Sequence, residues 1–223
     1  ASRMWAANLR GDTTRLAADT HPDDMAHGMS GLVMGIDVTG PTGEQVAVNP
    51  RRIDLSVQQR ARVFGDTMGF GFVLAAPGTI ADDSIEIPGP PLVLRRDEAV
   101  AITVHNRLTI PTSVHWHGLE LESYFDGVGG WSGSATRVAP DIAPGDSFVA
   151  RFTPPRAGTF IYHSHFSEVR QLSLGLFGAM VVLEPGARWD AERDRVVLFA
   201  VAGVGDSALV VAHQSGAPMR GGV

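Results

Sequence analysis

The chain has 223 residues, of which 44% are hydrophobic and 19% charged, and this composition is typical of a folded globular protein. Its formal net charge of -6 argues against nucleic-acid binding, because nucleic-acid-binding domains carry a basic face. Cysteine is absent, which excludes disulfides and thiolate metal ligands within these residues. No apolar run approaches the roughly 18 residues of a membrane span, and no signal peptide is visible.

The two ends of the chain differ in pattern from its middle. Residues 1–30 are polar and weakly periodic, 31–38 reads as an isolated strand, and 41–50 resembles a linker. A strand is predicted at 195–202, and a Gly-rich tail follows it. We therefore expect residues 1–45 to be the end of a preceding domain plus a linker. Residues 46–186 then form one complete domain, and 187–223 begin a following domain or form a tail.

Short apolar runs separated by Gly- and Pro-containing turns fill the middle of the chain. In one of them Val100, Ile102 and Val104 alternate with more polar residues, as in a half-buried strand. A short helical turn is expected only near residues 168–174. The pattern predicts an all-β sandwich or barrel of about seven or eight strands. The clearest expected strands are 92–95, 99–105, 113–122, 147–152, 158–163 and 176–183.

Two His-X-His pairs are the strongest functional signal. Residues two apart on a strand point to the same face, roughly 6.5–7 Å apart, so His115 and His117 project together and Trp116 packs on the opposite face. His163 and His165 repeat this arrangement. One such pair can be a polar surface, but if the two strands lie near each other in the barrel, the two pairs bring four imidazoles together. Imidazole suits copper, zinc, iron and nickel, so the spacing alone predicts a metal site without identifying the metal.

The strings around these histidines resemble the first two copper motifs of multicopper oxidases. They are VHWHG, a DG nine residues after His117, AGTFIYHSHF and QLSLGLFGAMVV, accompanied by PGPP and IAPGD. The resemblance covers roughly residues 88–185. It implies a cupredoxin-like Greek-key barrel or sandwich with copper as cofactor. The implied laccase-like reaction couples one-electron oxidation of a phenol, aromatic amine or metal ion to reduction of dioxygen to water.

The resemblance also implies a role for each motif residue. The family builds a trinuclear copper cluster from four His-X-His motifs, two on each of two cupredoxin domains. By position, His115 would bind the type 2 copper, whereas His117, His163 and His165 would bind the type 3 pair. Asp126 matches the acid behind the ligands that helps supply protons; the alternative is an ordinary Asp-Gly turn.

Other candidate residues carry weaker signals. Met29, in HGMSGLVMGI, resembles an axial ligand of type 1 copper, or it is a core methionine. Glu168 is either an outer carboxylate of the copper site or a solvated loop charge. His105 ends a predicted strand and is expected to be structural, and His213 supports no site.

The chain lacks half of the family's copper ligands. Without cysteine it cannot form a type 1 site, and the other two His-X-His motifs are absent. We therefore expect another cupredoxin domain or subunit to complete the cluster and this stretch alone to be inactive. Residues 1–45 would then be the remnant of an upstream cupredoxin domain. The resemblance also implies a periplasmic or secreted protein.

Two other functions remain open. One is a non-catalytic copper-binding or structural cupredoxin module. The other is a copper enzyme resembling nitrite reductase, which the paired motifs fit less well.

Overall fold

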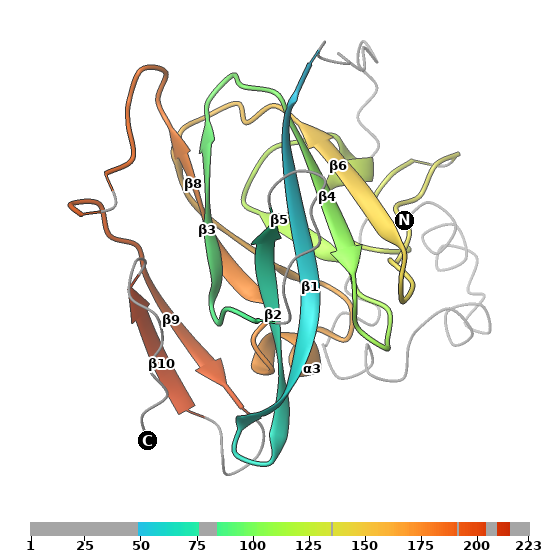
Figure 1. Ribbon diagram of the computed structural model, residues 1–223. Helices are drawn as coiled ribbons and strands as arrows, with labels where there is room; N and C mark the ends of the chain where they lie inside the picture. Colours follow the sequence, from blue (N-terminus) through green and yellow to red (C-terminus); the bar gives the residue numbers. More distant parts are fainter. Residues whose placement is uncertain (1–48, 76–83, 135, 191, 204–208, 215–223) are drawn as a thin grey trace, which may run out of the picture.

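Two four-stranded β-sheets packed face to face form the main body of the protein (Figure 1). The computed structural model describes residues 49–75, 84–134, 136–190, 192–203 and 209–214. The first sheet has the order β2-β1-β4-β6, and the second has the order β3-β8-β7-β5. The strands of the first sheet are β1 (Arg51–Phe64), β2 (Thr67–Ala75), β4 (Val100–Asn106) and β6 (Ser147–Phe152). Those of the second are β3 (Gly89–Arg95), β5 (Val114–His117), β7 (Gly158–Ser164) and β8 (Phe177–Leu183).

The chain crosses repeatedly between the two sheets. After β2 it enters the second sheet at β3, returns to the first at β4, and alternates again through β5 and β6. Neighbouring strands are antiparallel, except that β1 pairs with β4 and β3 pairs with β8 in parallel. The crossings and parallel pairs are those of a Greek-key sandwich, and the predicted all-β fold is confirmed.

Apolar side chains of both sheets meet in one core. The alternation predicted for Val100, Ile102 and Val104 is present, and all three side chains are buried between the sheets. The second sheet contributes Trp116 and Tyr162, which are also buried. The core therefore determines which face of each strand points inward and which face remains for other uses.

Two strands of the first sheet were not among the predicted elements. In β1 the alternation of Ile53, Leu55 and Val57 gives way to Gln58 and Gln59, so the apolar run is short although the strand extends to Phe64. β2 then pairs antiparallel with β1. The signal was present in the first half of β1, but it is weaker than in the later strands.

The predicted strand 113–122 is wrong in its length. β5 ends at His117, because Gly118 has a φ of +87° and turns the chain away from the sheet. A 3-10 turn, η2 (Ser123–Phe125), follows before the Asp126 loop. By contrast, the helical turn expected at 168–174 is present as α3 (Glu168–Ser173).

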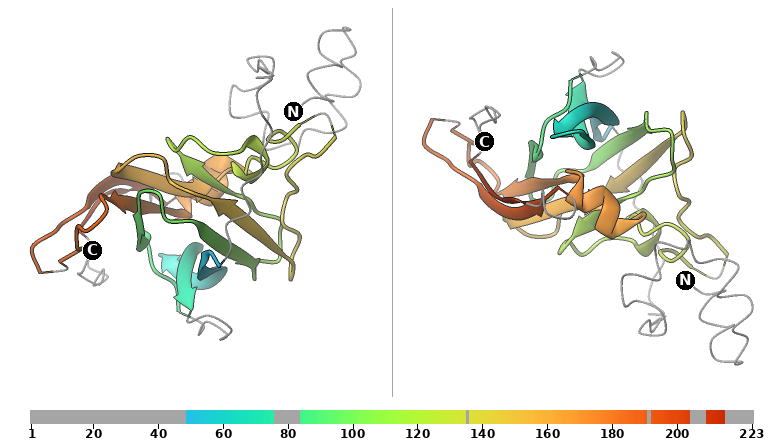
Figure 2. Two further views of the ribbon diagram at one scale, coloured as in Figure 1. Left: turned by 90° about the horizontal axis from the view of Figure 1, so that it is seen from above. Right: turned by 90° about the horizontal axis from the view of Figure 1, so that it is seen from below.

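A separate two-stranded ribbon extends to one side of the sandwich (Figures 1 and 2). It consists of β9 (Val197–Ala202), which confirms the strand predicted there, and β10 (Leu209–Gln214), a strand that was not predicted within the Gly-rich tail. Met29 and the strand predicted at 31–38 lie outside the described residues. The domain boundaries at 45 and 186 stay predictions. Among the described residues, no helix is long and apolar enough to cross a membrane.

Candidate metal centre

The two His-X-His pairs are carried by neighbouring antiparallel strands, with His165 directly after the last residue of β7. β5 forms the edge of the second sheet and pairs with β7, and the register places His115 directly opposite His163. The ring centroids of His117, His163 and His165 lie 5.3, 5.3 and 5.6 Å from that of His115. The structure thus brings the four predicted imidazoles into one cluster, although their spacing along the chain does not specify this pairing.

The residues between the histidines explain why the imidazoles face away from the core. Trp116 is opposite Tyr162 in the same register, and their relative exposures are 1% and 0%. Because side chains alternate along a strand, burying these two aromatic rings forces the flanking histidines to the other face. The prediction that Trp116 packs in the core is confirmed.

The nitrogen atoms of the cluster are spaced as metal ligands would be. One ring nitrogen from each of His115, His117 and His163 can be chosen so that all three lie within 4.8 Å of one another. The Nε2 atom of His163 is 3.4 Å from the Nδ1 atom of His117. Two nitrogens bound tetrahedrally to one ion at 2.0–2.1 Å would be about 3.4 Å apart. The pair His117 and His163 therefore fits a shared ion.

Hydrogen bonds orient two of the imidazole rings. The Nδ1 atom of His115 donates to the backbone carbonyl of Asp126 at 2.9 Å, and that of His163 donates to the carbonyl of Ser164 at 2.8 Å. A carbonyl oxygen only accepts, so Nδ1 carries the proton in both rings. Their Nε2 atoms are then the ones suited to bind a metal, which is how such backbone contacts preset metal-binding histidines.

Asp126 lies directly behind His115. Its Oδ1 atom is 3.3 Å from the Nδ1 atom of His115, and its Oδ2 atom accepts a hydrogen bond from Ser132 at 3.2 Å. Ser132 in turn accepts a hydrogen bond from the backbone N–H of Val128. Gly127 has a φ of +83° and packs so closely on the carbonyl of Val114 that any side chain would overlap it. Asp126 therefore belongs to an Asp-Gly loop and also contacts a histidine of the cluster.

Gln171 is a supporting residue that the sequence did not reveal. Its side chain is fully buried, and its Oε1 atom accepts hydrogen bonds from Thr112 at 2.8 Å and Ser164 at 2.6 Å. Its Nε2 atom donates to the carbonyl of Pro111. Gln171 thereby joins α3 to the segment before β5 and to the residue between His163 and His165. Gln171 opens the string QLSLGLFGAMVV, but that string alone does not assign it this role, because its partners are distant in sequence.

The remaining sequence candidates lie elsewhere. His105 is on β4 in the first sheet, where its Nε2 atom is 3.0 Å from the Oδ1 atom of Asp54, and its structural role stays a prediction. Glu168 begins α3, and its side chain lies outside the described set. His213 is in β10, away from β5 and β7 in the sheet order.

Comparison with known proteins agrees with the strings around the histidines. Residues 81–187 match the family model described as "Multicopper oxidase". The chain is 38% identical over 127 residues to multicopper oxidase MCE of Talaromyces pinophilus, covering 54% of this chain and 20% of that protein. It is 44% identical over 97 residues to laccase ustL of Ustilaginoidea virens, covering 43% of this chain and 14% of that protein. The matched part thus spans a fifth or less of these relatives.

A solved structure resembles the fold described above. The crystal structure of a multicopper oxidase from Pseudomonas thermotolerans superimposes with a TM-score of 0.52 and 27% sequence identity. The superposition covers 63% of this chain and 31% of that one. The sandwich of β1 to β8 is therefore of the cupredoxin-like type found in such proteins.

Proposed function

Over residues 81–187 this chain belongs to the multicopper oxidase family, and from that premise we propose that its four clustered histidines bind copper. His115 would hold a type 2 copper, and His117, His163 and His165 would hold a type 3 pair. These residues are about half of the ligands that a trinuclear cluster needs. The proposal rests on the strand register that places His115 opposite His163. It rests also on the distance of 3.4 Å between the Nδ1 atom of His117 and the Nε2 atom of His163.

The complete protein would be a copper-dependent oxidoreductase of the laccase-like kind. Copper, when bound, would supply the redox chemistry that couples one-electron oxidation of a phenol, aromatic amine or metal ion to reduction of dioxygen to water. The 223 residues contain no cysteine for a type 1 site and only two His-X-His pairs. A second cupredoxin domain or subunit would therefore complete the cluster, and the assembled protein would act outside the cytoplasm.

The protein's own contribution at this site is to orient ligands and hold a proton. The carbonyl of Asp126 keeps Nδ1 of His115 protonated and directs Nε2 toward the cluster. The Asp126 carboxylate is 30% exposed, so it can exchange protons with water while remaining 3.3 Å from the His115 ring. Ser132 keeps this carboxylate turned toward the ring. Asp126 is thus suited to hold a proton beside the ligands.

A non-catalytic copper-binding module is the second candidate, and the missing cysteine favours it. Both functions require copper at the histidines, but only the first requires turnover. Copper binding by the 223-residue chain, measured by metal analysis and electron paramagnetic resonance, tests what the two share. Oxidase assays of the complete gene product, with any partner subunit, then separate them.

We expect His163→Ala to lower copper stoichiometry and affinity while leaving the sandwich folded, because this imidazole faces away from the apolar core. His105→Ala is the matched control, since it removes a histidine from the other sheet. Copper binding by His163→Ala equal to that of the unmodified chain would overturn the assignment. Bound copper without oxidase activity in the complete, assembled protein would support the non-catalytic module instead.

A further inference from the structure

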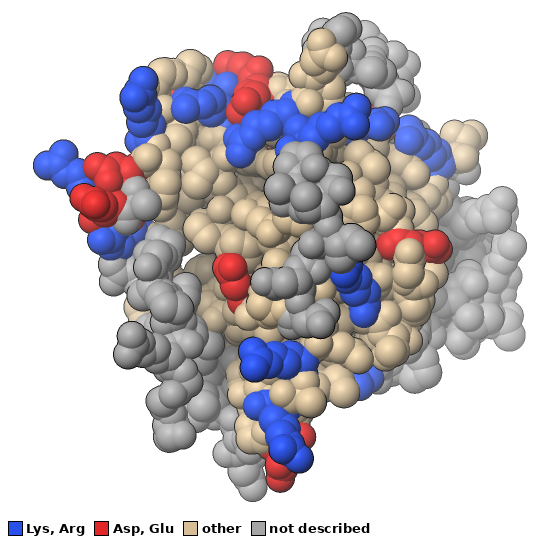
Figure 3. Space-filling model, viewed as in Figure 1, with Lys and Arg blue, Asp and Glu red and all other residues tan. Residues whose placement is uncertain are grey.

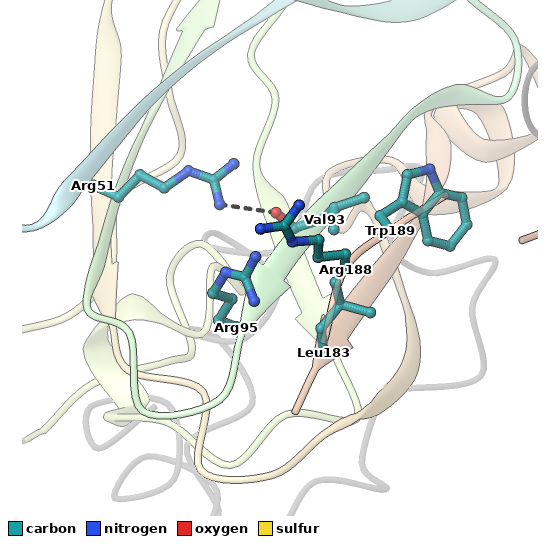
Figure 4. A pocket seen from close by; sticks show the side chains of 6 residues that line it. All are labelled: Arg51, Val93, Arg95, Leu183, Arg188 and Trp189. Carbon is teal, nitrogen blue, oxygen red and sulfur yellow. Dashed lines mark hydrogen bonds between the residues drawn. The ribbon is translucent and has the colours of Figure 1, made fainter. Parts of the chain in front are cut away.

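An arginine-lined pocket lies at the edge of the second sheet opposite to the histidines. That sheet has the order β3-β8-β7-β5, so β3 and β5 are its two edges. The pocket has a volume of about 520 Å³ and opens beside the C-terminal ends of β3 and β8 (Figure 4). In the space-filling view, positive side chains form a band across the upper part of this face (Figure 3). The residues lining the pocket are Arg51, Val93, Arg95, Leu183, Arg188 and Trp189.

Three guanidinium groups from different elements meet in this pocket. Arg51 begins β1, Arg95 ends β3, and Arg188 belongs to the segment after β8. The close-up shows the three groups turned toward a common region beside Val93 (Figure 4).

Backbone contacts hold two of these arginines in place. The Nη1 atom of Arg51 donates to the carbonyl of Val93 at 2.9 Å, and that of Arg95 donates to the carbonyl of Ala187. The second bond also fastens the segment that carries Arg188 to β3. Each guanidinium has five N–H donors, so most donors of Arg51 and Arg95 are left for a ligand.

Negative charge in the pocket does not balance the three arginines. Among the described residues, Glu98 is the one carboxylate in ion-pair contact with these arginines, its Oε2 atom lying 3.5 Å from the Nη1 atom of Arg51. Within the described part of the chain, Arg188 makes no hydrogen bond or ion pair. The whole chain has a net charge of -6, so a general excess of positive charge does not explain the cluster. Like charges held together repel one another, and an anion placed between them would relieve that repulsion.

The pocket is also larger and more apolar than a bare ion requires. Its volume falls in the range of small-molecule sites, roughly 300–1,000 Å³. Val93, Leu183 and Trp189 supply apolar surface beside the charges. Guanidinium groups match the paired oxygen atoms of carboxylates and phosphates, with which they form two parallel hydrogen bonds.

We propose that this pocket binds a small aromatic anion whose phosphate or carboxylate group is held by Arg51, Arg95 and Arg188. The apolar part of the ligand lies against Val93, Leu183 and Trp189. This site is independent of the histidine cluster, since it occupies the other edge of the sheet and uses none of the same residues. Its ligand binds whether or not metal is present.

Calorimetric titration of the 223-residue chain tests the proposal with three probes: inorganic phosphate, phenyl phosphate and benzoate. Tighter binding of phenyl phosphate than of inorganic phosphate is expected, because only the former covers the apolar surface. Comparison of phenyl phosphate with benzoate identifies the preferred acidic group. Absence of saturable binding by both aromatic probes at millimolar concentration would overturn the proposal.

Arg188→Gln should weaken binding of whichever aromatic probe binds more tightly by at least about tenfold. The substitution removes a charged hydrogen-bond donor that makes no contact of this kind within the described part of the chain. Arg193→Gln is the matched control: it changes the net charge equally at an exposed position outside the pocket. Equal weakening by the two variants would show non-specific attraction and would contradict a built site. Copper affinity should be the same in both variants.

Discussion

The two faces of the β5–β7 strand pair perform different tasks with one backbone register. On the inner face, Trp116 packs against Tyr162 and against Phe152, with ring centroids 6.2 and 5.5 Å apart. On the outer face, His115 and His163 stand opposite each other and their rings are turned edge to face. Residues that stabilise the fold therefore alternate with residues suited to bind metal. Stability and metal affinity should accordingly be separable by substitutions one position apart.

Of the variants considered, Trp116→Ala on the inner face should have the largest effect, and the effect is on stability. Removing this buried ring leaves a cavity between the sheets, and we expect a loss of about 3–5 kcal/mol in the free energy of unfolding. Chemical denaturation of the chain without metal measures it. Trp116→Phe is the control, because the indole Nε1 atom makes no hydrogen bond to any residue that the structure describes, and the smaller ring still fills part of the space. A stable Trp116→Ala protein that has lost only metal binding would contradict the separation of the two faces.

Asp126→Asn should affect the outer face alone. The substitution keeps the backbone carbonyl that binds His115 but removes the negative charge behind the ring. Loss of such a partner typically lowers metal affinity about 10–100-fold, so we expect weaker copper binding with little change in stability. Competition with a copper chelator measures the dissociation constant.

Two further variants sharpen the test of Asp126. Ser132→Ala should have the same direction and a smaller effect, because Ser132 acts only by orienting the carboxylate. Asp146→Asn, an exposed acid in the turn before β6, is the charge-matched control. Unchanged copper affinity in Asp126→Asn would leave Asp126 with the role of a turn residue only.

Tyr162→Phe should give the smallest effect and should leave copper binding unchanged. The Tyr162 hydroxyl donates to the carbonyl of Pro90 at 2.7 Å, and losing this buried bond should cost about 1 kcal/mol of stability at pH 7. Denaturation with urea measures the difference between the two proteins. A change in copper affinity would mean that the faces are coupled.

The same substitution has a pH signature. Burial, with a smaller contribution from the nearby Glu86 charge, raises the pKa of Tyr162 well above its usual value of 10.0. The folded state therefore holds this proton more tightly than the unfolded state does. The stability that the protonated hydroxyl contributes is complete below pH 10 and declines as the pH rises above it. The stability difference between the unmodified chain and Tyr162→Phe should accordingly narrow in alkaline solution.

The histidine site could be predicted only in part from the sequence. The two-residue period shows that His115 and His117 share a face, and the same holds for His163 and His165. It does not show that His115 pairs with His163, because 48 positions separate them and the pairing depends on the whole sheet. Gln171 was missed for the same reason, since its partners lie in β7 and before β5.

Local sequence patterns also failed to predict some strands of the fold and the arginine pocket. Short alternating runs identified most strands, whereas β1 was missed because Gln58, Gln59 and polar residues after them interrupt its apolar pattern. Arg51, Arg95 and Arg188 come from three separate segments and share no motif. Only the packing of those segments brings their charges together.

Because His115 and His163 lie opposite each other, metal binding also depends on the correct register between β5 and β7. A slip of one residue between β5 and β7 would turn one strand's histidines toward the core and its aromatic ring toward solvent. Such a misfolded molecule would present no more than one His-X-His pair on the outer face and would hold a metal ion poorly. An ion that binds only the native pairing of β5 with β7 stabilises that pairing relative to the slipped one. Metal supplied during folding would therefore increase the fraction of molecules with the native strand register.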